Sequence, residues 1–372
     1  MPTDAQVLDA LAEVREPHLE RPVTDLGMVG DLTVEDGSIR LELALPIPGS
    51  PGSDRLANDV TAALRAVPGV TEVHLAYRAM GEEQRRSLTR RLRAELGQVQ
   101  GSEVVFARPG SPTKVIAVAS GKGGVGKSSV TVNLAVALAE AGHAVGVMDA
   151  DIYGYSVPRM LGVSGKTYGM EGLVFPLRSY GCKVVSIGFF LPDPDRPVMW
   201  RGPMMHRALQ QFLSDVYWGE LDFLLIDLPP GTGDIAISLG QMLPDADLLV
   251  VTTPQEAAQK VAARAGQMAE ETGMHVAGVV ENMASFTCPD CGSSHDIFGS
   301  GGGATLAEEL GTQLLARVPI DPRVREGGDR GVPIVVGDPD APAARALRSV
   351  AETVVRRSRS VVGKSLPLVD GG

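Results

Sequence analysis

The glycine-rich segment Gly121-Lys-Gly-Gly-Val-Gly-Lys-Ser128 follows the apolar run Val115–Ala119 and precedes a helix expected from Ser129 to Ala141. In such a turn the glycines let several backbone N–H groups converge on phosphate oxygens, and the helix dipole adds to the attraction. Lys127 would reach the β- and γ-phosphates, and the Ser128 hydroxyl would bind Mg²⁺. The segment therefore predicts a loop that binds ATP with Mg²⁺ and supports its hydrolysis. The expected nucleotide contacts here are Gly121, Lys122, Gly123, Gly124, Val125, Gly126, Lys127, Ser128 and Ser129.

Carboxylates follow two other apolar runs that read as strands. Ala144–Met148 leads into Asp149 and Asp151, and Phe223–Ile226 leads into Asp227. In sheets of parallel strands, ligands bind at the carboxyl ends of the strands, so these side chains are expected near the phosphates. Asp149 and Asp227 would hold the water shell of Mg²⁺, and Asp151 would position the attacking water. The alternative is that such a carboxylate only caps the following helix.

A pair of cysteines, Cys288-Pro-Asp-Cys291, has the spacing that turns two thiolates toward one metal. Two thiolates do not complete a tetrahedral set. Two subunits meeting about a symmetry axis would supply four, enough for one [4Fe–4S] cluster or one zinc. The alternatives are a zinc site with His295 as third ligand, a redox disulfide, and purely structural cysteines. Cys182 stands alone before a strand and is expected to be a buried small hydrophobe.

From Lys114 onward, short continuous apolar runs alternate with helical segments. Continuous rather than alternating apolar strands indicate a sheet buried on both faces, hence a mostly parallel sheet covered by helices. The expected strands are Val115–Ala119, Ala144–Met148, Val184–Ile187, Phe223–Ile226, Leu248–Thr252, Val276–Val280 and Leu315–Val318.

The first eighty residues follow a different pattern and predict a small α+β domain. Leu32–Glu35 and Ile39–Leu45 alternate apolar and polar residues, and Asp36-Gly37 between them is a strong hairpin signal. Further elements are expected at Ala5–Val14 (helix), Asp54–Ala66 (helix) and Val70–Ala76 (strand). The predicted fold class is α/β, and the predicted domains are residues 1–80 (small domain), 81–112 (linker), 113–360 (P-loop ATPase domain) and 361–372 (flexible tail).

Composition and charge exclude several classes of partner. The 372 residues carry a net charge of −11, so there is no general attraction to nucleic acid or to an anionic membrane. Acidic residues are interspersed among the arginines within 81–112, and the aromatic side chains needed for stacking are missing, which favours a solvated helical face. No apolar run approaches the roughly 18 residues of a membrane span, and the N-terminus has no secretory signal. We expect a cytoplasmic protein whose partners include neither nucleic acid nor membrane.

Lys122, the first lysine of the glycine-rich segment, indicates a particular class of ATPase. The sequence Lys-Gly-Gly-Val-Gly-Lys-Ser resembles the deviant P-loop of the MinD/ParA-like ATPases. In that class the early lysine crosses a dimer interface to contact the nucleotide of the other subunit, as an arginine finger does. The resemblance implies a homodimer in which Lys122, Lys127 and Asp151 are catalytic. It further implies base contacts from Asn282, Pro319 and Asp321.

The cysteine pair narrows this resemblance. It follows Asn282-Met283, and the chain from Lys114 to Val336 resembles the Mrp/ApbC group of iron–sulfur carriers, whose C-P-x-C motif lies in this interval. The resemblance implies a slow ATPase that holds a [4Fe–4S] cluster between subunits through Cys288 and Cys291. The implied partners are apo iron–sulfur proteins and other assembly factors.

The N-terminal segment Val23-Thr-Asp-Leu-Gly-Met-Val29 resembles the small iron–sulfur-assembly domain that bacterial members of this group carry. Many such domains have a cysteine near the loop that corresponds to Ile47-Pro-Gly-Ser-Pro51, and this loop has none. We therefore expect the small domain to dock partners rather than to bind metal.

Two alternatives share the nucleotide site. A positioning or partitioning ATPase with a structural zinc site is the first, although the C-terminal tail has Gly363, Pro367 and few of the apolar anchors of a membrane-binding helix. The second is an electron donor resembling nitrogenase reductase, which bridges a cluster with two separated cysteines per subunit rather than with C-x-x-C.

Overall fold

The computed structural model describes residues 2–47, 49, 52–97, 103–152, 154–191, 202–231, 233–288 and 290–358. The expected tail at 361–372 and most of the loop at 47–51 lie outside these ranges. The chain forms two compact units. The first unit comprises Met1–Pro109, Gly165–Leu177 and Phe189–Glu220, and the second comprises Gly110–Ser164, Arg178–Gly188 and Leu221–Gly372.

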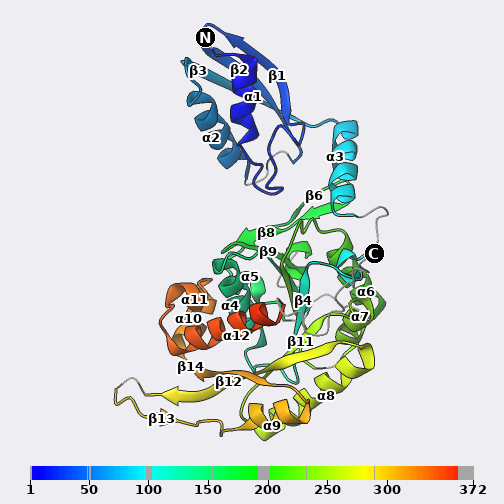
Figure 1. The fold of residues 1–372 in the computed structure, drawn as a ribbon, viewed down its shortest axis with the longest axis vertical. Helices are drawn as coiled ribbons and strands as arrows, with labels where there is room; N and C mark the ends of the chain where they lie inside the picture. The colour runs from blue at the N-terminus through cyan, green and yellow to red at the C-terminus, as the bar shows by residue number, and fades with distance from the viewer. Residues whose placement is uncertain are drawn as a thin grey trace, which may run out of the picture. The chain divides into compact units, whose positions relative to one another are not determined.

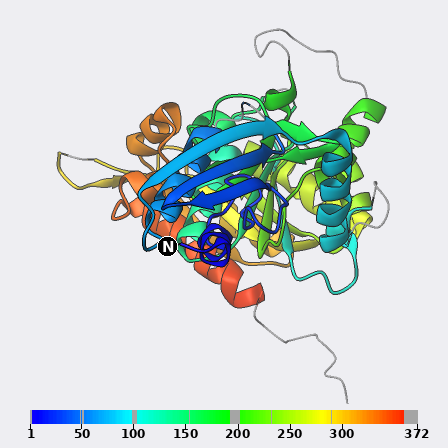
Figure 2. The same cartoon turned by 90° about the horizontal axis from the view of Figure 1, so that it is seen from above.

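The first unit contains a three-stranded sheet in the order β1-β2-β3, with helices packed on one face (Figures 1 and 2). Asp36 and Gly37, between β1 and β2, both have positive φ angles of 48° and 83°, which is the conformation that a two-residue hairpin turn requires. Ile39, Leu41 and Leu43 alternate along β2 and enter the core with residues of both helices. The elements are α1 (Asp4–Ala12), β1 (Val29–Glu35), β2 (Ser38–Leu45), α2 (Gly52–Arg65) and β3 (Glu72–Ala79).

The same unit includes residues up to Pro109 of the predicted linker 81–112, together with two segments from later in the chain. Leu88 and Leu92 of α3 are buried in the core that also holds Leu173 and Phe175. The later segments join because their apolar residues need this core, a long-range contact that no local pattern signals. These elements are α3 (Glu82–Glu95), a 3-10 turn η1 (Val105–Ala107), β6 (Tyr168–Met170), β7 (Leu173–Phe175) and α6 (Gly202–Ser214).

The second unit is built on a sheet in the order β13-β12-β11-β4-β10-β5-β9-β8, with β14 beside β12. The ladders among β9, β5, β10, β4, β11, β12 and β14 are all parallel, and the β12–β13 ladder is antiparallel. This confirms the predicted mostly parallel sheet. The strands are β4 (Lys114–Ser120), β5 (Val145–Asp149), β8 (Leu177–Ser179), β9 (Cys182–Ser186), β10 (Phe223–Asp227), β11 (Asp247–Thr252), β12 (His275–Thr287), β13 (Ser294–His295) and β14 (Leu314–Ile320).

Helices of the second unit form two groups, which flank the sheet in Figure 1. The helices of one group contact one another with α4 at their centre, and α8 is the helix that contacts both other members of the second group. Ten of the residues of α4 are buried, because the helix lies between the sheet and α12. The first group is α4 (Lys127–Glu140), α5 (Val157–Met160), α10 (Pro322–Arg330), α11 (Ile334–Gly337) and α12 (Pro342–Ser358), and the second is α7 (Asp234–Met242), α8 (Glu256–Thr272) and α9 (Gly302–Glu309).

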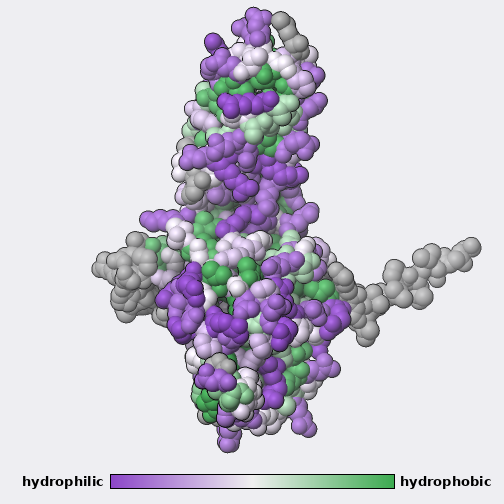
Figure 3. All heavy atoms as spheres, turned by 90° about the vertical axis from the view of Figure 1, so that its left-hand side faces the viewer, coloured by the Kyte–Doolittle hydropathy of each residue, from purple (hydrophilic) through white to green (hydrophobic). Residues whose placement is uncertain are grey.

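Hydrophilic residues cover much of the face drawn in Figure 3, with hydrophobic ones scattered between them. Among the helices in the described ranges, none combines the length and apolar character that a bilayer span needs.

Candidate nucleotide site and cysteine hairpin

The glycine-rich loop connects the buried strand β4 to the first turn of α4. Gly126 precedes the helix with a φ of 83°, a left-handed conformation that favours glycine. The neighbouring carbonyl of Val125 accepts a hydrogen bond of 2.8 Å from Asn282 Nδ2 on β12. A Cβ at Gly126 would overlap this amide nitrogen. Glycine is therefore required here for its backbone angle and for the close approach of β12.

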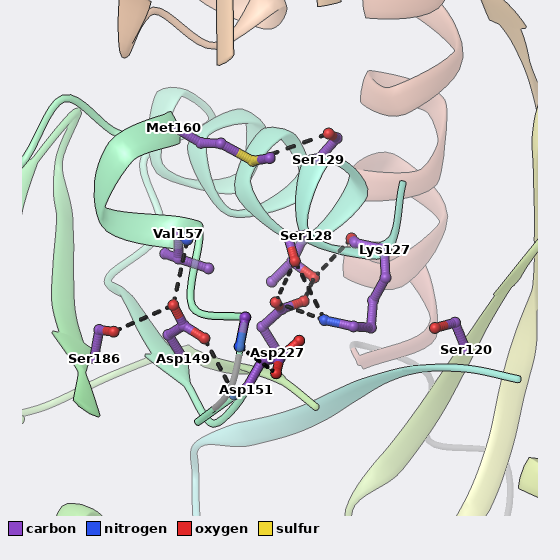
Figure 4. Close-up of polar contacts among 12 residues, drawn as sticks. Ser120, Lys127, Ser128, Ser129, Asp149, Asp151, Val157, Met160, Ser186 and Asp227 are labelled. Atoms are coloured by element: carbon purple, nitrogen blue, oxygen red, sulfur yellow. Dashed lines mark hydrogen bonds and ion pairs between the residues drawn. The ribbon is translucent and has the colours of Figure 1, made fainter. Parts of the chain in front are cut away.

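Lys127 and Ser128 are held by one buried carboxylate (Figure 4). The Lys127 Nζ atom lies 2.7 Å from Asp227 Oδ2, and Ser128 Oγ donates to the same oxygen at 2.5 Å. The other oxygen, Oδ1, accepts a 2.7 Å hydrogen bond from Thr131 Oγ1. Asp227 is fully buried and Lys127 is only 6 % exposed. The lysine and the hydroxyl are thus fixed at the mouth of the loop, where a phosphate and Mg²⁺ would meet them, so these residues fit that group.

Thr131 was not anticipated from the sequence. It lies one helical turn after Lys127, so helical spacing places its hydroxyl on the side of α4 that faces β10. That spacing was the available signal.

Asp149 ends β5 beside Asp227, in register with it across the β5–β10 ladder. Its carboxyl accepts hydrogen bonds from Ser186 Oγ at 3.2 Å, Val157 N at 3.3 Å and Asp151 N at 3.2 Å. Burial, followed by the charge of Asp227, raises the pKa of Asp149 to about 8. Near neutral pH the nucleotide-free site therefore retains a proton at this carboxyl.

Asp151 lines the cavity above the loop together with Lys122, Lys127 and Ser128. This cavity has a volume of about 240 Å³. Asp151 is 8 % exposed, and its Oδ1 accepts a 3.0 Å hydrogen bond from Gly154 N. The carboxylate is therefore held at the wall of the space in which a γ-phosphate and a water would lie.

Lys122 is half-buried, and its Nζ donates a 2.8 Å hydrogen bond to Gln255 Oε1 of the same chain. The Gly123 backbone beside it is exposed. In a single subunit the lysine is thus held near the cavity by its own chain.

A second cavity of about 670 Å³ adjoins the first. The two share Gly126, Ser129, Ser156 and Met160 in their walls, so they lie side by side. The three residues predicted to contact the base line this second cavity, which we call the base cavity: Asn282, Pro319 and Asp321.

The carboxylate of Asp321 is already engaged within the chain. Its Oδ1 caps α10 by accepting from the backbone N of Arg323 at 3.0 Å and from that residue's Nε at 2.9 Å. The hydrogen bond from the guanidinium lowers the pKa of Asp321 below its usual value. Its place on the cavity wall therefore follows from its role as a helix cap.

The cysteines lie on a turn that we call the cysteine hairpin, residues 286–295. Its stem is the β12–β13 ladder, and across the turn Cys288 N donates to Ser293 O at 2.9 Å. It projects from the sheet of its unit in Figures 1 and 2. Cys288 is half-buried and Cys291 is exposed, and a hydrogen bond to Ser293 lowers the pKa of the Cys291 thiol.

The hairpin does not hold a complete metal site within one chain. In the part of the chain that the structure describes, no three His, Cys, Asp or Glu side chains come together as a metal-binding group. His295, the alternative third zinc ligand, is an exposed residue paired with Phe286 in the stem. The two thiols fit a site that is completed by ligands from another molecule. Cys182, by contrast, is buried in β9, and burial raises the pKa of its thiol to about 12.

Comparison with known proteins identifies the family. Residues 111–355 match the family described as the NUBPL iron-transfer P-loop NTPase. The chain belongs to this family. Residues 4–75 match a second family, described as an iron–sulfur cluster assembly protein.

Relatives of this iron-transfer NTPase family extend the match to the full chain. An iron–sulfur cluster carrier protein of Mycobacterium bovis is 48 % identical over 98 % of this chain and 96 % of its own length. A nucleotide-binding protein of Archaeoglobus fulgidus, solved in complex with ADP, is 39 % identical with a TM-score of 0.55, over 62 % of this chain and 91 % of that one. The cell division ATPase MinD of Pyrococcus furiosus, 24 % identical with a TM-score of 0.50 over 66 % of this chain and 99 % of its own, shares the fold. The predicted membership of the Mrp/ApbC-type carriers with a MinD-like fold is confirmed.

Substitution at Gly126 should destabilise the protein more than substitution at another glycine of the same loop. We expect Gly126→Ala to lower the stability of the nucleotide-free protein by about 1–3 kcal/mol, because it combines a positive φ with a steric overlap. Gly123→Ala is the matched control, since its nearest neighbour to a new Cβ is Pro230 Cγ at 4.0 Å. Denaturant unfolding measures both. Equal stability of the two variants would contradict this account.

Binding of MgADP should release a proton from the Asp149 carboxyl. With its pKa raised to about 8, this group is mostly protonated at pH 7, and Mg²⁺ favours the ionised form. Affinity should therefore rise with pH, by at most about tenfold per pH unit, and level off above about pH 8. Calorimetry in two buffers of different ionisation enthalpy counts the proton. Asp149→Asn should abolish the release, and an unchanged proton count in that variant would refute the assignment.

Proposed function

We propose that this protein is an ATP-hydrolysing carrier that holds a [4Fe–4S] cluster between two subunits and transfers it to apo iron–sulfur proteins. The observation that carries the proposal is the cysteine hairpin. Its two thiols lie on a projecting turn, and Cys291 is exposed and has a lowered pKa. The turn directly follows β12, the strand that contacts the glycine-rich loop. Two such hairpins supply the four thiolates that one cluster needs. Exposed thiolate ligands suit a cluster that has to be transferred to another protein.

The nucleotide half of the mechanism follows from the buried network. Lys127 would neutralise charge on the β- and γ-phosphates, and Ser128 and Asp227 would hold the Mg²⁺ site. When bound, Mg²⁺ supplies further neutralisation of the phosphate charge. Asp151, fixed by Gly154 N, would orient the attacking water. Asp227 and Asp151 are held in place by their own chain before nucleotide binds, which supports a partly preorganised site.

The homodimer is part of the same proposal. Lys122 would leave Gln255 and contact the nucleotide of the second subunit, which would bring the two cysteine hairpins into one assembly. The small N-terminal domain, which matches the iron–sulfur assembly family, would dock apo-proteins or other assembly factors.

A positioning ATPase with a structural zinc site is less well supported. Zinc could use the same four thiolates of two subunits, but the matched family is described as an iron-transfer NTPase, which favours iron as the metal.

Anaerobic reconstitution tests the carrier function. We expect wild-type protein to bind about four iron and four sulfide per dimer, and Cys288→Ala/Cys291→Ala to bind almost none. Cys182→Ala is the matched control, because that thiol is buried in β9 and should leave loading unchanged. Visible absorbance with iron and sulfide assays provides the measurement. A double variant that loads as much cluster as wild type would overturn the proposal.

Sedimentation with MgATP tests the dimer. Lys122→Ala should lose ATP-dependent dimerisation and at least about tenfold in hydrolysis rate, while one subunit still binds MgADP. Lys260→Ala provides the control, since this exposed lysine pairs along its own helix with Glu256. Dimerisation that persists unchanged in Lys122→Ala would show that the lysine stays within its own subunit.

A further inference from the structure

Two apolar side chains after the cysteine hairpin have no role in the site described so far. Ile297 and Phe298 are 57 % and 36 % exposed, yet both line the base cavity. They follow His295, the last residue of β13, almost immediately. The chain that returns from the cysteines therefore forms part of the cavity wall.

The outgoing side of the hairpin lines the same cavity. Asn282 and Met283 of β12 face it, and Asn282 also bonds the loop carbonyl of Val125. The register between β12 and β14 shifts between Asn282 and Phe286, and Met283 has a φ of 57°. Such a bulge redirects a side chain out of the regular alternation of a strand. As a result, both sides of the hairpin meet at the base cavity.

The cavity's charges leave an apolar surface for a ligand. Asp329 pairs with Arg159 and with Arg325, each at 3.0 Å, and Asp321 is paired with Arg323. With these charges satisfied, the unpaired contact surface is formed by Met283, Ile297, Phe298 and the β14 residues. An uncharged planar ring suits such a wall, and the adjoining phosphate cavity indicates that the ring is the base of a nucleotide.

The path from this wall to the cysteines is short and hydrogen-bonded. His295 pairs with Phe286, Ser294 pairs with Thr287, and Cys288 N donates to Ser293 O at 2.9 Å. Backbone pairing in the stem therefore connects the segment that carries Ile297 to the turn that carries the cysteines.

We infer that Ile297 and Phe298 are base-contacting residues, and that a bound base fixes the returning side of the hairpin and so positions Cys288 and Cys291. The inference rests on the proposed function only for the identity of the cargo, an iron–sulfur cluster bound by the cysteines. A nucleotide that fills both cavities would order the hairpin, whereas a ligand that fills the phosphate cavity alone would not. By linkage, cargo on the cysteines would change nucleotide affinity by the same factor.

Hydrogen exchange of the metal-free chain tests this with two probes, MgADP and magnesium tripolyphosphate. Both should protect the amides of 121–128, which reports occupancy of the loop. Only MgADP should slow exchange in the hairpin, residues 286–295, by about threefold or more. Equal protection of the hairpin by the two probes would overturn the inference, because the coupling would then run through the loop alone.

Substitution assigns the effect to the two side chains. In Ile297→Ala/Phe298→Ala, saturating MgADP should protect the loop but protect the hairpin no more than tripolyphosphate does. Ile237→Ala, at a 38 % exposed isoleucine on α7 that does not line the cavity, should behave as wild type. Full hairpin protection in the double variant would refute the role of Ile297 and Phe298. Since no cluster is present, failure here leaves the reconstitution result standing, and the reverse also holds.

Discussion

The buried carboxylate of Asp227 is the contact around which the second unit is organised. It ends the strand beside β4, so the loop leaving β4 can place Lys127 and Ser128 on one of its oxygens while Thr131 binds the other. An ionised carboxylate at zero exposure is costly unless its lone pairs are satisfied, and here a cation and two hydroxyls satisfy them. Asp149 lies beside it, and burial, followed by the negative charge of Asp227, raises the pKa of Asp149.

A second contact, the hydrogen bond from Asn282 to Val125, links the glycine-rich loop to β12. The strand β12 begins in the sheet core, passes the loop, kinks at Met283 and ends at the first cysteine. One continuous strand therefore carries Asn282, which contacts the loop, and leads directly to Cys288, the first of the two cysteines proposed as metal ligands. Coupling between the two sites needs no movement of whole domains, only a change in how firmly this strand and its return are held.

Much of this could be predicted from the sequence, for identifiable reasons. The phosphate loop is contiguous, and the carboxylates Asp149 and Asp227 each follow a continuous apolar strand, so local pattern was sufficient to place them at one sheet edge. Thr131 and Ser186 are single hydroxyls without a distinctive pattern, and Ile297 with Phe298 is an apolar pair in a loop without periodicity. Strands of two or three residues, such as β6 and β13, are too short to show alternation. The inclusion of residues 165–177 in the first unit depends on long-range packing, which spacing along the chain does not encode.

The hydrogen bond between Lys122 and Gln255 has a bearing on when subunits can associate. In the proposed dimer, Lys122 would have to leave Gln255 before it could contact the nucleotide of the second subunit, and a hydrogen bond to a charged group contributes about 1.5–3 kcal/mol. This free energy is small compared with the attraction between a lysine and a triphosphate, but it is comparable to the free energy of weak association between two nucleotide-free subunits. In the proposed dimer, Gln255 would therefore set a threshold: it would hold Lys122 in nucleotide-free chains and release it when the phosphates of the second subunit's nucleotide are present.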